Sequence, residues 1–340
     1  MIKSLFFIIL FVCANSTKAQ IKNLVFEGAG IRGIAYCGAI KVLEEKNLLQ
    51  NIERVGGTSA GAITALLLSL DYKADEISEL INSTSFKKFN DGNFLIFGGI
   101  HRLKRNYGWY RGRRVENWLD KVIEAKTGNA EITFKELNEK GYKDLFITGT
   151  SLDQQKLFVF SNETFPQMKI KDAVRISMSI PLYFEAIFMT ESGNIITHPK
   201  GKERYHVMVD GGLIANFPIH LFDSTKYIDD SKPNEFAINA HTIGFRIDRA
   251  EQITKDSITP GLANFSINHF NDFMGAFNNI IIENLNRQNL TEKDWERTIA
   301  INDGAITPRI KKMPSKKVKQ LIKNGEEATT NYFSKQLAKD

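Results

Sequence analysis

The sequence predicts an α/β fold in which helices cover a largely parallel central sheet, and three observations support that prediction. A short apolar run at 23–26 is followed by a glycine cluster and a helical pattern at 34–43. The same succession recurs, with a strand-like run at 52–56, a sharp turn at 57–61 and an apolar helix at 62–70. Further strand-like runs, with helical patterns between several of them, lie at 145–148, 157–160, 207–209 and 242–247.

The first helical pattern has one apolar face. Ala35, Ala39 and Leu43 recur every four residues and fall on one side of a helix, with Gly38 and Val42 beside them. This spacing is typical of a helix that packs against a sheet.

The chain of 340 residues is long enough to bury one large core, since 42% of its residues are hydrophobic and 25% are charged. It contains no internal repeat and no long linker rich in Pro, Gly or Ser. We therefore expect one main domain at 20–263 and a mainly helical, polar part at 264–340 that packs on the same domain. A lysine-rich stretch at 309–323 is typical of a solvated helix face.

Residues 1–19 have the layout of a signal peptide. Lys3 precedes an apolar run at 5–12, and the small residues Thr17 and Ala19 suit cleavage before Gln20. The prediction is an exported protein that is secreted, periplasmic or associated with an outer membrane. A buried strand or a membrane anchor are the alternatives. No later segment is apolar for long enough to span a bilayer.

Cysteine usage and charge set two further limits. Cys13 does not fit a lipoprotein signal, because Val12 is larger than the residue that normally precedes such a cysteine. Once the signal is removed, Cys37 is the only cysteine left, so the mature protein has no internal disulfide. The net charge of +6 is too small to indicate binding to nucleic acid or to anionic membranes.

A candidate nucleophile stands at the second turn, where Gly57-Thr58-Ser59-Ala60-Gly61 matches G-x-S-x-G. In this motif the serine occupies a strained turn between a strand and a helix, and the glycines remove side chains that would clash there. The predicted strand before the motif and the apolar helix after it provide the context that the motif requires. The helix N-terminus also favours developing negative charge at the serine.

The first turn carries a glycine-rich loop, Gly28-Ala29-Gly30-Ile31-Arg32-Gly33. The loop formally fits the dinucleotide-binding pattern, but that fold needs an acidic residue at the end of the second strand. Glu53 is the only candidate, and it lies early in that strand. The loop is better explained as a row of backbone N–H donors, at a helix N-terminus, for the oxyanion of an acyl-transfer intermediate.

A third motif, Asp210-Gly211-Gly212, follows the strand-like run at 207–209. Glycines after an aspartate allow a tight turn that leaves the carboxylate exposed. Alone the pattern indicates only a turn. It gains meaning from its position after the glycine loop and the serine turn.

The three motifs in this order resemble the patatin-like phospholipase family. The resemblance covers residues 23–222, with lesser similarities at Ser179-Ile180-Pro181 and at Asn216, and weaker likeness continues through 297–301. The sequence departs from the family pattern at Glu27, often Asp, and at Ala29, usually Gly. Because a backbone donor survives a change from Gly to Ala where φ is negative, we expect activity to be retained.

The resemblance implies a patatin-like fold with a Ser–Asp dyad, in which Asp210 is the general base for Ser59. It implies lipid acyl hydrolysis of the phospholipase A or lysophospholipase type, with an ester lipid as substrate and no cofactor. No metal-ligand cluster is visible in the sequence, so we predict no metal requirement. Arg32 suits either a lipid phosphate or an ion pair that braces the loop.

Two other interpretations of the sequence remain open at this point. His220 or His241 could complete an α/β-hydrolase triad with Ser59 and Asp210, although only one strand precedes the strand that leads into the serine turn and that fold normally has several. The chain could also be a non-catalytic lipid-binding protein of the same fold.

Residues 94–114 combine apolar, aromatic and basic side chains. The basic members include Arg111, Arg113 and Arg114. This composition suits either a membrane-docking flap beside the site or an ordinary packed helix and hairpin. We expect peripheral membrane contact and no nucleic acid. Acyl position, chain length, head group and oligomeric state are not specified by the sequence.

Overall fold

The computed structural model describes residues 20–338 except for short gaps. The gaps are 93–94, 198, 200–203, 230–231, 257–258, 260, 270–271, 274, 278, 281–286, 288–289 and 307–312. The predicted signal peptide and Phe94 lie outside the described residues. No helix of the described part is both long and apolar enough to cross a membrane.

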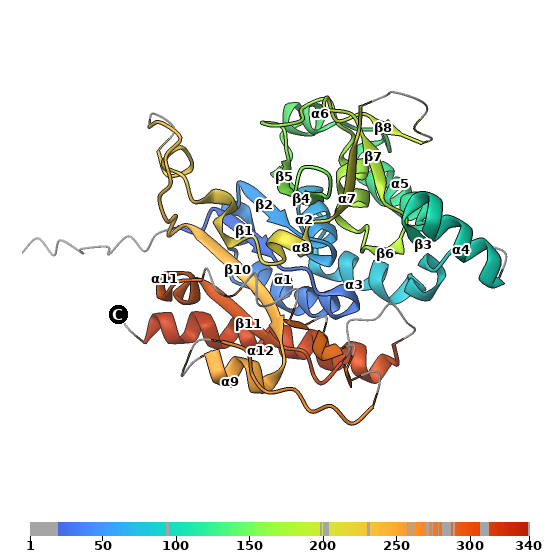
Figure 1. Cartoon of the computed structure of the whole chain (residues 1–340). Coiled ribbons are helices and arrows are strands. Elements are labelled where there is room, and N and C mark those ends of the chain that lie inside the picture. Colours follow the sequence, from blue (N-terminus) through green and yellow to red (C-terminus); the bar gives the residue numbers. More distant parts are fainter. Residues whose placement is uncertain are drawn as a thin grey trace, which may run out of the picture.

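A mixed sheet forms the centre of the molecule (Figure 1). Five strands run parallel in the order β11-β10-β1-β2-β4. Their bounds are β1 Asn23–Phe26, β2 Arg54–Gly57, β4 Asp144–Ser151, β10 Thr242–Asp248 and β11 Thr298–Asn302. The prediction of an α/β fold with a mostly parallel central sheet covered by helices is confirmed.

Beyond β4 the sheet continues with antiparallel pairs. β5 and β9 both pair with β4, and β7 and β8 continue from β9. Their bounds are β5 Lys156–Phe160, β7 Ile187–Met189, β8 Ile195–Ile196 and β9 His206–Asp210. A separate two-stranded sheet joins β3 (Gly108–Tyr110) to β6 (Leu182–Phe184).

Helices follow most strands and cover the sheet (Figure 1). The α-helices are α1 Tyr36–Glu45, α2 Ala60–Ser69, α3 Ala74–Ser83, α4 Leu95–Asn106, α5 Arg113–Thr127, α6 Phe134–Glu139, α7 Ile170–Ser177, α8 Gly212–Ala215, α9 Ala250–Asp256, α11 Glu292–Glu296 and α12 Ser315–Leu337. Short 3-10 helices are η1 Gly30–Ala35, η2 Leu49–Asn51, η3 Phe86–Phe89, η4 Ile219–Phe222 and η5 Thr225–Tyr227. Most buried apolar side chains join one core cluster.

The part from residue 264 onward completes this architecture. It contributes β11 to the edge of the sheet as well as helices. α12 runs beside α1 below the sheet (Figure 1). The two helices meet at Gly38 and Gly325, where an added Cβ would overlap the backbone of the other segment. Only glycines allow so close a crossing.

Candidate active site

Ser59 lies on the turn between β2 and α2. Its backbone has φ 53° and ψ −118°, a conformation that L-residues rarely adopt. Its N–H donates to the Ser177 Oγ at 2.8 Å, and the residue is 8% exposed. Ser59 thus occupies a strained turn between a strand and a helix.

Small residues make this turn possible. A Cβ at Gly57 would overlap the carbonyl of Gly61, and one at Gly61 would overlap the carbonyl of Phe26. The hydroxyl of Thr58 lies 2.6 Å from that of Thr148 in β4. The turn is thus held against β1 on one side and β4 on the other.

Asp210 reaches Ser59 from across the sheet. β2 pairs with β4 so that Gly57 lies opposite Ile147, and β9 pairs with β4 so that Asp210 lies opposite Gly149. The end of β9 is therefore level with the serine turn just beyond β2. The Ser59 hydroxyl lies close enough to the Asp210 carboxylate to lower the pKa of that carboxyl.

The environment of Asp210 suits a general base. Burial raises the pKa of its carboxyl from 3.8 to about 7, and hydrogen bonds from the Gly212 N–H and the Ser59 hydroxyl partly offset this rise. The Gly212 N–H lies 2.8 Å from Oδ1. A carboxyl with a pKa near neutral pH can both take and return a proton.

The glycine loop lies directly beside the nucleophile. A Cβ at Gly28 would stand 3.3 Å from the Cβ of Ser59. Among the described residues, no protein acceptor lies within hydrogen-bonding distance of the N–H groups of Ala29, Gly30 and Ile31. These three donors are available to an oxyanion.

Three details refine the predicted loop. The Gly28 N–H donates to the Asn216 carbonyl at 2.9 Å, so Gly28 contributes space and not a donor. Ala29 has φ −136°, which an alanine adopts without strain, and Gly30 takes the left-handed value of +55°. Gly33 lets η1 approach α2, since its added Cβ would stand 2.9 Å from that of Ala60. The departure from the family pattern at Ala29 leaves the backbone donor in place.

Arg32 braces the loop. Its Nε donates to the Ala29 carbonyl at 3.2 Å, and its Nη1 lies 3.2 Å from Oδ2 of Asp303. Of the two roles suggested by the sequence, the structure favours the ion pair over a lipid phosphate.

Neither candidate histidine lies where a triad needs it. The Nδ1 of His220 is 2.7 Å from Asp223, while the Nδ1 of His241 is 2.7 Å from the Gln20 carbonyl. His241 precedes β10 at the amino ends of the parallel strands, whereas Ser59 follows the carboxyl end of β2. In the described part of the chain, no histidine lines the pocket beside Ser59.

The structure brings together a cluster of potential metal-ligating side chains that the sequence analysis did not predict. His220, Asp223 and Asp294 bring their ligand atoms within 4.8 Å of one another. The guanidinium of Arg297 lies 2.5 Å from Asp223 and 2.6 Å from Asp294. Because this guanidinium already forms ion pairs with both carboxylates, the cluster gives no support for a metal site.

An apolar pocket opens beside Ser59. The empty space between its walls, including the open mouth, is about 820 Å³. Residues of α1, α2, α3, η3 and α5 line it. Cys37 is among them, and burial raises the pKa of its thiol to about 12, so the thiol stays protonated.

The segment predicted as flap or packed hairpin is α4, β3 and the start of α5. Arg102 is buried, and its Nε donates to the Trp109 carbonyl at 2.9 Å. Ile100 and Tyr107 are 40% and 47% exposed. The segment reaches the pocket through β3, which pairs with β6, and Phe184 of β6 lines the pocket.

Comparison with known proteins decides the family. The model of the patatin-like phospholipase family matches residues 24–223. The chain belongs to the patatin-like phospholipase family. The resemblance stated from the three motifs is thus confirmed, and the match contains Ser59, Asp210 and the glycine loop.

Relatives of this patatin-like protein come from several sources. Protein R571 of Acanthamoeba polyphaga mimivirus is 29% identical over 208 residues, which is 61% of this chain and 63% of the relative. The probable lipid hydrolase 463L of invertebrate iridescent virus 6 is 27% identical over 65% of this chain and 70% of its own. The structure of VipD from Legionella pneumophila aligns with a TM-score of 0.55 and 16% identity, over 93% of this chain and 67% of that one. The VipD likeness supports the fold alone.

The structure adds site residues to which the sequence analysis gave no role. Asn216 contacts the glycine loop, and Ser177 accepts the Ser59 N–H. Asn216 has a signal in the sequence, its position shortly after the aspartate turn. Ser177 has none, because α7 reaches the serine turn only through the tertiary fold.

Proposed function

We propose that this protein is a serine lipid acyl hydrolase that cleaves carboxylic ester bonds of membrane lipids. One observation carries the proposal. Ser59, on a strained turn, lies beside the buried Asp210 at an apolar pocket. Membership of the patatin-like phospholipase family and the likeness to a probable lipid hydrolase support it.

The proposed reaction needs only this pair of side chains and the loop. Asp210 takes the hydroxyl proton of Ser59 as its Oγ bonds to the ester carbonyl carbon. The carbonyl oxygen becomes an oxyanion, which the N–H groups of Ala29, Gly30 and Ile31 stabilise. When the tetrahedral intermediate collapses, the C–O bond to the leaving alcohol breaks, and that alcohol takes the proton from Asp210.

A water molecule completes the cycle. Asp210 takes a proton from the water as its oxygen attacks the acyl-serine carbonyl. The second tetrahedral intermediate releases the fatty acid, and Ser59 regains its proton. Asp210 therefore acts as base and acid in both halves.

The substrate class follows from the pocket. Apolar side chains line the space next to Ser59, which suits the acyl chain of a lipid. The family name supports a phospholipase, and we propose an activity of the phospholipase A or lysophospholipase type. Peripheral contact with a membrane and export through residues 1–19 complete the proposal.

Hydrolysis of a short-chain p-nitrophenyl ester and of phosphatidylcholine vesicles tests the proposal. We expect Ser59→Ala and Asp210→Asn to lower kcat by at least about 10⁴-fold, as for other serine hydrolases. His220→Ala and His241→Ala serve as matched controls that keep wild-type turnover. Circular dichroism and thermal unfolding establish that each variant is folded.

Two results would contradict the proposal in different ways. If a histidine variant were as inactive as Ser59→Ala, a histidine triad would replace the dyad. If the folded wild-type protein hydrolysed no ester and yet bound lipid, the protein would be a lipid-binding member of the family.

A further inference from the structure

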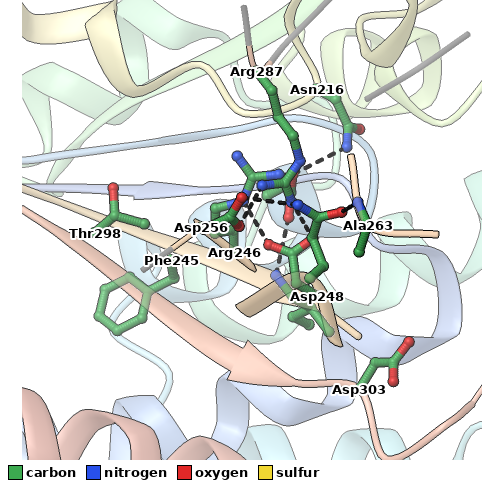
Figure 2. A network of polar contacts seen from close by, with 12 residues as sticks. Asn216, Phe245, Arg246, Asp248, Asp256, Ala263, Arg287, Thr298 and Asp303 are labelled. Carbon is green, nitrogen blue, oxygen red and sulfur yellow. Dashed lines mark hydrogen bonds and ion pairs between the residues drawn. The ribbon is translucent and has the colours of Figure 1, made fainter. Parts of the chain in front are cut away.

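A buried network of charged side chains adjoins the glycine loop (Figure 2). At its centre Arg246 of β10 is fully buried. Its Nη2 lies 3.0 Å from Oε1 of Glu27, and its Nε lies 2.9 Å from Oδ2 of Asp248. Asp248 also pairs with Arg287, whose Nη1 is 2.5 Å from Asp256. The network thus joins the end of β1 to the part of the chain after β10.

Glu27 connects this network to the glycine loop, because it immediately precedes Gly28 in the sequence. Its Oε2 accepts the Ile247 N–H at 2.9 Å, and its carbonyl accepts the Tyr36 hydroxyl at 2.8 Å. Its N–H donates to the Phe245 carbonyl at 2.9 Å. The residue is therefore held by side chain and backbone alike.

Asn216 ties the loop to the aspartate turn. Its carbonyl accepts the Gly28 N–H, and its Nδ2 donates to the Gly28 carbonyl at 3.0 Å. The same Nδ2 lies 3.4 Å from Oε1 of Glu27. Figure 2 shows Asn216 extending toward the charged network. One amide thus connects the network, the loop and the segment after Asp210.

A second brace holds the other end of the loop. Arg32 pairs with Asp303, and the Asp303 N–H donates to the Asp248 carbonyl at 2.9 Å. Both ends of the loop, Glu27 and Arg32, are therefore anchored on neighbouring residues at the carboxyl ends of β10 and β11.

Stability alone is a weak reason for this arrangement. Removing several charges from water is costly, and buried ion pairs are often no better for stability than apolar side chains of similar size. Stabilising an oxyanion, by contrast, depends on N–H donors that are fixed before the reaction. A displacement of the loop would weaken all three donors together.

We propose that Glu27, Arg246, Asn216 and Asp303 are positioning residues that hold the glycine loop in the geometry required by the oxyanion. The inference rests on the proposed function. It assigns a role in the reaction to Arg246 and Asp303, which lie beyond the residues matched by the family model. The glycine loop would then depend on the C-terminal part of the chain.

Three isosteric changes of carboxylate to amide test the proposal in the full chain. Glu27→Gln and Asp303→Asn weaken the two braces, and Asp294→Asn weakens the buried ion pair with Arg297 as a matched control. Glu27→Asp keeps the charge and serves as the conservative variant. Each protein is compared for kcat, KM and thermal unfolding.

The decisive measurement compares two inhibitors. An alkyl trifluoromethyl ketone adds to a serine and forms an oxyanion, whereas the secondary alcohol with the same alkyl chain fills only the pocket. We expect Glu27→Gln to lower kcat and ketone affinity by about 10- to 100-fold, and Asp303→Asn less, since one lost oxyanion donor typically costs about 10²- to 10³-fold. KM and alcohol affinity should stay unchanged, Glu27→Asp should recover part of the loss, and Asp294→Asn should match wild type.

Equal losses of ketone and alcohol affinity, or equal effects of Glu27→Gln and Asp294→Asn on kcat, would overturn the proposal and leave a structural role. If Glu27→Gln does not fold, Asp303→Asn decides by the same criteria, because its partner Arg32 is partly exposed. A folded wild-type protein that neither hydrolyses esters nor binds the ketone would instead overturn the proposed function.

Discussion

At the scale of single residues, the site combines two features that each cost stability. Ser59 has a backbone conformation that is unfavourable for a serine, and Asp210 is a buried carboxyl. The absence of side chains at Gly57 and Gly61 leaves room for the strained turn at Ser59. Gly212 and Ser59, which lower the pKa of the Asp210 carboxyl, offset only part of the rise that burial causes. The raised pKa that results is what a base for Ser59 needs.

The raised pKa predicts how activity depends on pH. Only deprotonated Asp210 can take the Ser59 proton, so kcat/KM for a soluble short-chain ester should rise about tenfold per pH unit below pH 7. It should level off above the pKa of about 7. Initial rates between pH 5 and pH 9 measure this profile. A flat profile between pH 5 and pH 8 would show that Asp210 is not the base or that its pKa is near 4.

Unfolding of Asp210→Asn provides the control for that assignment. In the wild type the folded protein retains a proton that the unfolded chain releases, so the free energy of unfolding falls as pH rises from about 4 to about 7. A shift from 3.8 to about 7 corresponds to at most about 4 kcal/mol, since one pKa unit is worth about 1.4 kcal/mol. The amide variant should lack this part of the pH dependence.

At the scale of elements, β9 and the crossing of α1 with α12 position the site. β9 runs antiparallel to β4, and this direction places its last residue, Asp210, beside the serine turn. α12 packs on both α1 and η1, the helices that follow the first strand. The glycine loop is thus supported by an element more than two hundred residues away along the chain.

The helix crossing gives a prediction about stability. Gly38→Ala or Gly325→Ala places a Cβ into the backbone of the facing segment, so we expect a loss of about 3 kcal/mol in the free energy of unfolding. Urea denaturation measures this loss. Gly128→Ala is the matched control, because its Cβ would meet no atom within 4 Å and only its φ of +72° causes strain. That control should lose about 1 kcal/mol. Equal losses would contradict the close crossing.

At the scale of the whole molecule, two exposed apolar side chains lie close in the sequence to residues of the site. Leu182 is 67% exposed and lies between Ile180 and Phe184, which line the pocket. Ile214 is 39% exposed in α8, directly after the aspartate turn. These positions, close in the sequence to the pocket lining and to the aspartate turn, support the proposed membrane contact.

Replacing these two side chains tests the membrane contact. Burying a leucine or isoleucine in an apolar phase is worth about 1.5–3 kcal/mol, so the double variant of Leu182→Ser and Ile214→Ser should bind phosphatidylglycerol vesicles at least about tenfold more weakly. Hydrolysis of a soluble short-chain ester should be unchanged. Vesicle sedimentation gives the readout, and Phe236→Ser is the control, since Phe236 is 73% exposed beside His220.

The basic residues of the segment at 94–114 form a second arm of that experiment. Neutralising Arg111, Arg113 and Arg114 should weaken binding to anionic vesicles more than to phosphatidylcholine vesicles. If both the apolar and the basic variants bound vesicles as the wild type does, the proposal that these residues contact the membrane would be wrong.

Local sequence patterns were sufficient for four of the five parallel strands and for recognising the three motifs, whereas β11 lies in the part expected to be mainly helical. β1 begins and ends as predicted, and α2 begins two residues earlier because the serine turn leads directly into it. Glycines at 28–33, 57–61 and 211–212 could be recognised as motifs, although several of them make room for segments that are distant in the sequence. The family could be recognised from the same residues.

The tertiary structure decided what the motifs do together. The direction of β9, the exclusion of His220 and His241, and the pairing of Arg32 with Asp303 depend on segments that are distant in the sequence. The buried network around Arg246 has no local pattern either. Local rules of backbone geometry specify the turns, whereas the distances and the burial that give Asp210 its raised pKa arise only when remote strands and helices pack together.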